Sequence, residues 1–164
     1  MAIYSLKSVQ RIPVPVAEIW DFFSSPKNLP VLTPPSLGFK IISKHHGSEI
    51  YAGQIIEYKV KPLFRISLYW MTEITHVDPE KYFVDEQRYG PYAMWHHQHH
   101  FRQVDGGVEM TDIVHYKNPF WVLGDIANTV VVRAKLRDIF TYRYTRIEER
   151  FGRWPGQEMS LELR

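Results

Sequence analysis

The central part of the chain alternates between apolar and polar positions as paired strands do. The segment from Phe83 to Tyr116 is rich in aromatic and β-branched residues, and turn residues at Gly90-Pro91 and at Asp105-Gly106-Gly107 divide it into three runs. Each run has the length and composition of a β-strand. The pattern predicts a three-stranded antiparallel meander.

The turns of this meander predict which side chains share a face. A two-residue turn at 105–106 places His99 opposite Asp112, and a short connection in the first hairpin places Asp85 opposite His97. Directly opposed residues point to the same side of a sheet, whereas a three-residue second turn would separate them. With the two-residue turn, one face carries Phe83, Asp85, Gln87, Trp95, His97, His99, Phe101, Met110, Asp112, Val114 and Tyr116. This mixture of apolar, acidic and imidazole side chains is typical of a ligand cavity rather than a dry core.

The segments before and after the meander show patterns typical of helices and of further strands. Apolar residues at three- and four-residue steps predict a long helix over 120–151, and Pro15 suits the start of a short helix after the first strand. Residues after about 152 are expected to form a loosely ordered tail. The remaining predicted elements are strands over 2–12, 37–45, 50–60 and 65–76 and a second short helix over 27–32.

This order of elements predicts an α+β fold in a single domain over 1–164. Seven antiparallel strands with one apolar face should curl under their own twist, and that face must be buried against another layer. Only the C-terminal helix is long enough, so a space is expected between the sheet and this helix. The basic residues of the helix, Arg143 among them, are expected to form a solvated face.

Composition excludes several kinds of function. The chain has no cysteine, so thiolate metal sites and thiol nucleophiles are impossible, and its net charge of +2 is too small to indicate nucleic acid as a partner. No run of 18 apolar residues exists, so stable membrane insertion is not expected. We expect a cytoplasmic protein, either a monomer or a homodimer.

The candidate chemistry lies with His97, His99, Asp85 and Asp112. An Asp beside a His in a partly desolvated pocket favours proton transfer near neutral pH, so these four residues are the candidate catalytic groups. Two imidazoles and a carboxylate could also hold a metal, but the sequence identifies no residues to orient such ligands, and we expect neither a metal nor a cofactor. A purely structural hydrogen-bonded network is a further alternative.

Five motifs carry a resemblance to a known superfamily. The segments 15–30, 33–39, 85–92, 95–101 and 110–116 resemble the START-related helix-grip (SRPBCC) superfamily, which includes polyketide cyclase/dehydrase-like and pollen-allergen-like proteins, and within it a bacterial subgroup. The resemblance implies a helix-grip fold, with a curled sheet around the C-terminal helix and a hydrophobic cavity for a small or lipid-like ligand. It implies a binding role and no particular reaction.

Together these observations favour a protein that binds or transports a small hydrophobic or lipid-like ligand between the sheet and the C-terminal helix. The alternative is a cofactor-independent cyclase, dehydratase or hydrolase that uses a His/Asp pair in the same cavity. The predicted ligand-binding residues are Tyr58, Trp70, Phe83, Asp85, Gln87, Trp95, His97, His99, Phe101, Met110, Asp112 and Tyr116.

Overall fold

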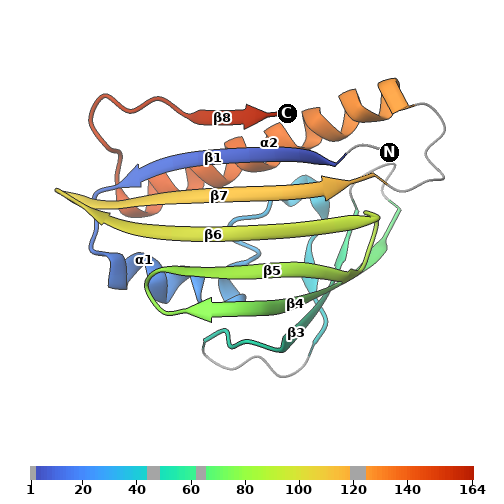
Figure 1. Cartoon of the computed structure of the whole chain (residues 1–164), viewed down its shortest axis with the longest axis horizontal. Helices are drawn as coiled ribbons and strands as arrows, with labels where there is room; N and C mark the ends of the chain where they lie inside the picture. Colours follow the sequence, from blue (N-terminus) through green and yellow to red (C-terminus); the bar gives the residue numbers. More distant parts are fainter. Residues whose placement is uncertain (1–2, 44–48, 62–65, 119–124) are drawn as a thin grey trace.

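The computed structural model describes residues 3–43, 49–61, 66–118 and 125–164. The strands form one antiparallel sheet of eight in the order β2-β3-β4-β5-β6-β7-β1-β8. In Figure 1 strands β4 to β7 and β1 face the viewer, and β1 and β7 cross in front of the long helix α2 (Asp125–Phe151). The strands are β1 (Tyr4–Ile12), β2 (Lys40–Ile41), β3 (Gln54–Val60), β4 (Leu68–Asp78), β5 (Tyr82–Tyr89), β6 (Met94–Val104), β7 (Gly107–Lys117) and β8 (Ser160–Leu163). The predicted α+β fold, with its long C-terminal helix, is confirmed.

Short helices follow β1, as predicted. Helix α1 (Val16–Phe23) begins directly after Pro15 and buries Ile19, Trp20, Phe22 and Phe23. The second predicted helix, over 27–32, is a single 3₁₀ turn, η1 (Pro26–Asn28), and another 3₁₀ turn, η2 (Pro35–Leu37), follows it. Proline at the first position of both turns fixes the backbone for a helical start. Pro30 follows η1 closely and prevents a longer helix there, whereas η2 ends at Gly38 in a left-handed conformation.

The central meander has the predicted register. In the β6–β7 hairpin Val104 pairs with Gly107 and His99 pairs with Asp112, while Asp85 of β5 pairs with His97. Gly106 adopts a φ of 83°, which a residue without a Cβ reaches at no steric cost and which the two-residue connection uses. The two imidazoles and two carboxylates therefore share one face of the sheet.

The C-terminal tail differs from the prediction. Residues 160–163 form the edge strand β8, which pairs with β1 from Leu6–Leu163 to Val9–Ser160. Leu161 and Leu163 alternate with polar residues and pack against the buried cluster around Leu6. The end of the tail therefore forms a strand, and the sheet has eight strands instead of the predicted seven. Two apolar residues are sufficient to hold this strand, because the backbone groups along the edge of β1 are available for pairing.

Two predicted strands are shorter than expected, and the one over 50–60 is β3, which begins at Gln54. The strand expected over 37–45 is limited to Lys40–Ile41, because η2 continues through Leu37 and Gly38 follows in a left-handed conformation with φ 51°. The first five residues of the predicted helix over 120–151 lie outside the described residues, as do the ends of the strands expected over 2–12, 37–45 and 65–76.

The helix α2 is held against the inner face of the sheet by an apolar stripe. Leu136, Phe140, Tyr144 and Ile147 are all buried, and they recur at the three- and four-residue spacing of one helix face. In addition, the Gln10 side chain of β1 donates a hydrogen bond to the backbone carbonyl of Tyr144 over 3.1 Å. No helix in the described part of the chain is long and apolar enough to cross a bilayer.

We expect the Ile147→Ala variant to lose about 2–5 kcal/mol of unfolding free energy, because it leaves a cavity beneath α2. Ile147 is 1% exposed in the protein. Urea unfolding monitored by circular dichroism measures the loss. Val131→Ala, at a position of the same helix that is 41% exposed, is the matched control and should change stability by less than about 0.5 kcal/mol. Equal effects of the two substitutions would show that this helix face does not pack on the sheet.

Candidate functional site

A cavity of about 640 Å³ is lined both by the inner face of the sheet and by α2. The α2 side of the cavity consists of Val132, Leu136, Ile139, Phe140 and Arg143, and side chains from α1, the 3₁₀ turns and the inner faces of β3 to β6 complete the lining. Most of the surrounding side chains are apolar. The curvature of the sheet and the length of α2 thus leave a space that side chains do not fill.

Aromatic rings form one wall of this cavity. Trp70 stacks on Tyr58 with ring centroids 5.7 Å apart and meets Trp95 edge to face at 5.6 Å. Thr72 satisfies the polar tips of two rings, since its hydroxyl lies 2.9 Å from the Tyr58 hydroxyl and accepts from the Trp70 indole N–H at 3.1 Å. Burial of Tyr58 raises the pKa of its phenol. The rings of Tyr58 and Trp70 therefore present apolar faces to the cavity while their polar atoms are paired with Thr72.

A cluster of two histidines and two aspartates lies beside the aromatic wall. His97 Nε2 lies 3.0 Å from Asp112 Oδ1 and His97 Nδ1 lies 3.5 Å from Asp85 Oδ2. His99 Nε2 lies 2.9 Å from Asp85 Oδ2 and His99 Nδ1 lies 2.8 Å from Asp112 Oδ1. Each imidazole therefore bridges the two carboxylates, and all four ring nitrogens face a carboxylate oxygen.

Arg143 of α2 completes this cluster. Its Nη2 atom lies 3.3 Å from Asp112 Oδ1 and 3.1 Å from His99 Nδ1, and its guanidinium also lies 5.0 Å from the centroid of the Phe23 ring. The sequence predicts a solvated Arg143, but only 12% of its side chain is exposed. The guanidinium instead supplies the positive charge that the buried Asp112 requires.

Burial and neighbouring charges shift the ionisation of the cluster. Burial by itself opposes ionisation of Asp112, but the Arg143 charge and the hydrogen bonds from the two imidazoles outweigh it and hold its pKa well below the usual range. The pKa of Asp85 is also lowered, because the two imidazoles outweigh its burial. For His97, burial and the neighbouring His99 lower the pKa to about 4. At neutral pH the cluster therefore contains two carboxylates and a neutral His97.

Ring packing fixes the orientation of the imidazoles. The His99 ring stacks on Phe83 with centroids 4.1 Å apart and an interplanar angle of 19°, and the His97 and His99 centroids are 3.8 Å apart. Both histidines are nearly inaccessible, at 6% and 4% exposure. The nitrogen atoms are thus held at defined positions at the cavity surface. Asp85, His97 and His99 each offer a ligand atom within 4.8 Å of the others, close enough to share one cation.

The structure divides the predicted ligand-binding residues into two groups. Tyr58, Trp70, Phe83, Asp85, Trp95, His97 and His99 line the cavity. The others do not: Asp112 lies behind the histidines, and Phe101, Met110 and Tyr116 are buried in the core. Gln87 donates to the Tyr92 carbonyl at 2.7 Å and accepts from its N–H at 3.2 Å, which connects the ends of the β5–β6 hairpin. Whether the lining residues bind a ligand stays a prediction.

The sequence interpretation missed several lining residues, chiefly Arg143 and Phe140 of α2 and Tyr92 in the connection between β5 and β6. A signal for Arg143 exists, since it lies three residues after Phe140 and four before Ile147 and thus interrupts the buried stripe of α2. No comparable pattern marks Tyr92, because it lies in the connection between two strands.

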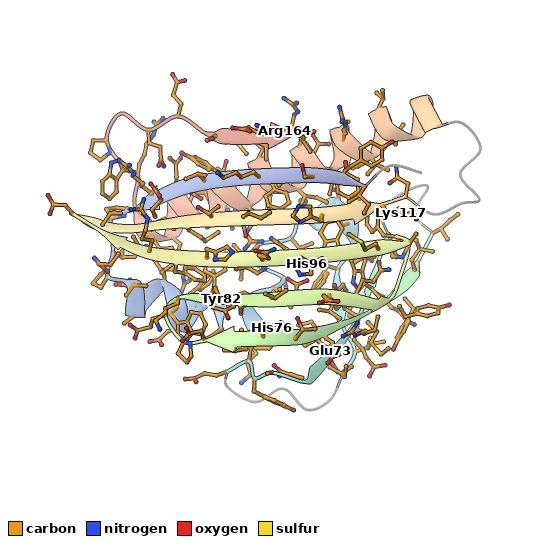
Figure 2. The ribbon with its side chains drawn as sticks, viewed as in Figure 1. Glu73, His76, Tyr82, His96, Lys117 and Arg164 are labelled. Atoms are coloured by element: carbon orange, nitrogen blue, oxygen red, sulfur yellow. The ribbon has the colours of Figure 1, made fainter. Side chains whose placement is uncertain are left out.

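The other histidines of β6 and β7, His96, His100 and His115, lie on the opposite face of the sheet, because successive side chains of a strand point to opposite sides. Figure 2 shows His96 and Tyr82 on the face that is turned away from α2. His100 stacks on Tyr82 with centroids 5.7 Å apart, and His96 lies 6.2 Å from the ring of His115 across the strand pair. These residues have no access to the cavity.

A curved antiparallel sheet packed against one long C-terminal helix, with a few short helices, defines a helix-grip protein. The chain belongs to the polyketide cyclase/dehydrase and lipid transport family, whose sequence model matches residues 12–139. This agrees with the superfamily resemblance found in the sequence. No curated protein matches the chain significantly.

Solved structures of the same fold come from bacteria and plants. Protein Ms6760 from Mycobacterium smegmatis is 20% identical, with a TM-score of 0.64 and 88% of each chain covered. A protein from Arthrobacter aurescens is 14% identical, with a TM-score of 0.66, and covers 88% of this chain and 86% of its own. The ginseng major latex-like protein 151 from Panax ginseng is 15% identical, with a TM-score of 0.64, and covers 91% of this chain and 97% of its own. At these identities the similarity shows the fold alone.

We expect Asp112→Asn and Arg143→Met each to lower the unfolding free energy by about 3–5 kcal/mol, because each leaves one charge of a buried pair uncompensated. The double variant should lose less than the sum of the two single losses. Urea unfolding of all four proteins gives the coupling. The exposed pair Lys81–Asp78, with Nζ and Oδ2 3.1 Å apart and 72% and 40% of the side chains exposed, is the matched control and should show little coupling. Additive losses at Asp112 and Arg143 would contradict the buried pair.

Proposed function

We propose that the protein binds a small amphipathic molecule in the cavity between the sheet and α2. The observation that carries this proposal is an apolar, aromatic-walled space with its charged side chains gathered at one place. The volume of about 640 Å³ lies within the range of about 300–1,000 Å³ found for small-molecule sites. The family's description includes lipid transport as well as cyclase and dehydratase chemistry, which agrees with a hydrophobic cargo.

The arrangement of the lining indicates how such a ligand is oriented. Its apolar body would lie against Trp70 and Trp95 on one side and against the apolar residues of α2 on the other. Its polar group would lie at Asp85, His97, His99 and Arg143, which together offer both hydrogen-bond donors and acceptors. A hydroxyl or carbonyl oxygen fits this end better than an anionic group, because the two carboxylates already neutralise the charge of Arg143 and would repel a further negative charge.

We expect Trp70→Ala to weaken binding of the fluorescent probe anilinonaphthalene sulfonate about twofold to tenfold, since it removes an aromatic contact of about 0.5–1.5 kcal/mol. Fluorescence titration of the purified protein measures the affinity. Trp154→Ala is the matched control, because Trp154 lies beside Arg11 and does not line the cavity. Equal affinities of the two variants would mean that the probe binds elsewhere.

Native mass spectrometry of the protein as purified complements this titration. A copurified small molecule at one per chain would identify the ligand class directly, and extraction followed by rebinding would confirm that it competes with the probe. A copurified molecule that does not compete with the probe would contradict binding in this cavity.

Acid–base catalysis in the same cavity is the second candidate function. One observation favours it: His97, neutral at pH 7 because burial lowers its pKa to about 4, lines the cavity and is oriented by Asp112 behind it. A neutral imidazole oriented by a carboxylate is the arrangement of a general base.

Turnover separates the two candidates. If the protein is an enzyme, incubation with its copurified ligand should give a product of changed mass, and His97→Gln should lower that rate by about 10²–10⁴-fold. Ligand binding should persist in this variant. Recovery of the unchanged ligand from wild-type protein would leave binding as the function.

A further inference from the structure

We propose that Asp85, His97 and His99 form a binding site for one divalent transition-metal ion at the surface of the cavity. The coordinating atoms are Asp85 Oδ2, His97 Nδ1 and His99 Nε2, which lie within 4.8 Å of one another. This site goes beyond the binding of an amphipathic ligand and does not depend on it.

The arrangement of ring nitrogens around Asp85 is the first argument for a cation. His97 Nδ1 and His99 Nε2 lie 3.5 and 2.9 Å from the same oxygen, Asp85 Oδ2, and each neutral imidazole carries one N–H. Without a metal, His97 Nε2 can donate to Asp112 and His99 Nε2 to Asp85, while His99 Nδ1 accepts from Arg143. The lone pair of His97 Nδ1 then faces Asp85 Oδ2 with no hydrogen between them. A cation beside Asp85 would use this lone pair, and the N–H of His99 could move to Nδ1, which lies 2.8 Å from Asp112 Oδ1.

The distances around Asp85 suit a metal ion. Two ligand atoms that are each about 2.1 Å from a metal lie about 3.0–3.4 Å apart in octahedral or tetrahedral geometry. Asp85 Oδ2 lies 2.9 Å from His99 Nε2 and 3.5 Å from His97 Nδ1. Small rotations of the side chains would therefore bring all three atoms to coordination distance.

Asp112 provides the outer contacts that metal-bound histidines require. Histidine ligands usually donate their second N–H to a carboxylate or carbonyl, which fixes the tautomer and the ring orientation. Asp112 can accept from both histidines at once, and Arg143 Nη2 lies 3.3 Å from the same oxygen.

The proposed metal ligands lie at the cavity surface and their outer hydrogen-bond partner lies behind them, as these two roles require. Asp85, His97 and His99 line the cavity, whereas Asp112 lies behind them. A metal bound by the three inner residues would keep open positions toward the cavity, as in sites with two histidines and one carboxylate. This donor set suits zinc or iron(II) better than calcium or magnesium, which prefer oxygen ligands.

Cobalt(II) binding to the full chain tests the site. After treatment with EDTA and removal of the chelator, we expect one Co²⁺ per chain, with a visible absorption band and displacement by Zn²⁺. Asp85→Asn should weaken binding at least tenfold, and Asp112→Asn about tenfold to hundredfold. A thermal melt of each variant checks that it is folded, and X-ray absorption of the cobalt-loaded wild type should show two imidazole ligands without relying on any variant.

The outward-facing histidines provide the matched control, since His96 and His115 also lie side by side on β6 and β7. The double variant His96→Ala/His115→Ala should bind Co²⁺ as tightly as the wild type and show the same two-imidazole signature. Loss of binding in this control would assign the metal to the outer face and overturn the proposal. Absence of stoichiometric cobalt binding to the wild type would also overturn it and would leave the cluster as a hydrogen-bonded network.

Discussion

The burial of Asp112 is the constraint on which the rest of the site depends. This side chain is 2% exposed, and a carboxylate so far from water must be compensated by charge and hydrogen bonds. Three groups do this, namely the imidazoles of His97 and His99 and the guanidinium of Arg143. They come from β6 and α2, so satisfying one carboxylate on β7 requires the helix to lie at one particular position on the sheet.

The same contacts explain why the cavity has two unlike parts. Where Arg143 meets Asp112, α2 is drawn to the sheet by charge, and toward the N-terminal side of the helix Val132, Leu136 and Ile139 face open space. The polar atoms of Tyr58 and Trp70 are paired locally through Thr72, so these two rings can present apolar faces to the cavity. A molecule with an apolar body and one polar group matches this division, and a metal at Asp85 would add a coordination point to the polar part.

Much of the architecture follows from local patterns in the sequence. The turn at Asp105-Gly106 sets the register of β6 and β7, which places His97, His99 and Asp112 on one face. The register of the β5–β6 hairpin adds Asp85 to the same face. The helix of the C-terminal region is equally clear from its repeating apolar positions. These features depend on neighbours in the chain or across a short hairpin, which is why the sequence is sufficient to predict them.

The features that the sequence did not predict depend on distant partners. Leu161 and Leu163 are too few to indicate a strand, and they form one because the β1 edge is free to pair. Arg143 looks like the other basic residues of α2 until the sheet brings Asp112 to it. Likewise Phe101, Met110 and Tyr116 share the parity of the lining residues, but α1 and α2 cover them, so parity alone cannot separate the cavity from the core.

A crystal structure of the protein with its copurified ligand would test the central claim most directly, since it reports where the polar group of the ligand lies. We predict that the apolar body lies against Trp70 and Trp95 and that a ligand oxygen lies within hydrogen-bonding or coordination distance of the cluster formed by Asp85, His97, His99 and Arg143. A ligand whose polar group lies away from these four side chains, or outside the space between the sheet and α2, would contradict the account.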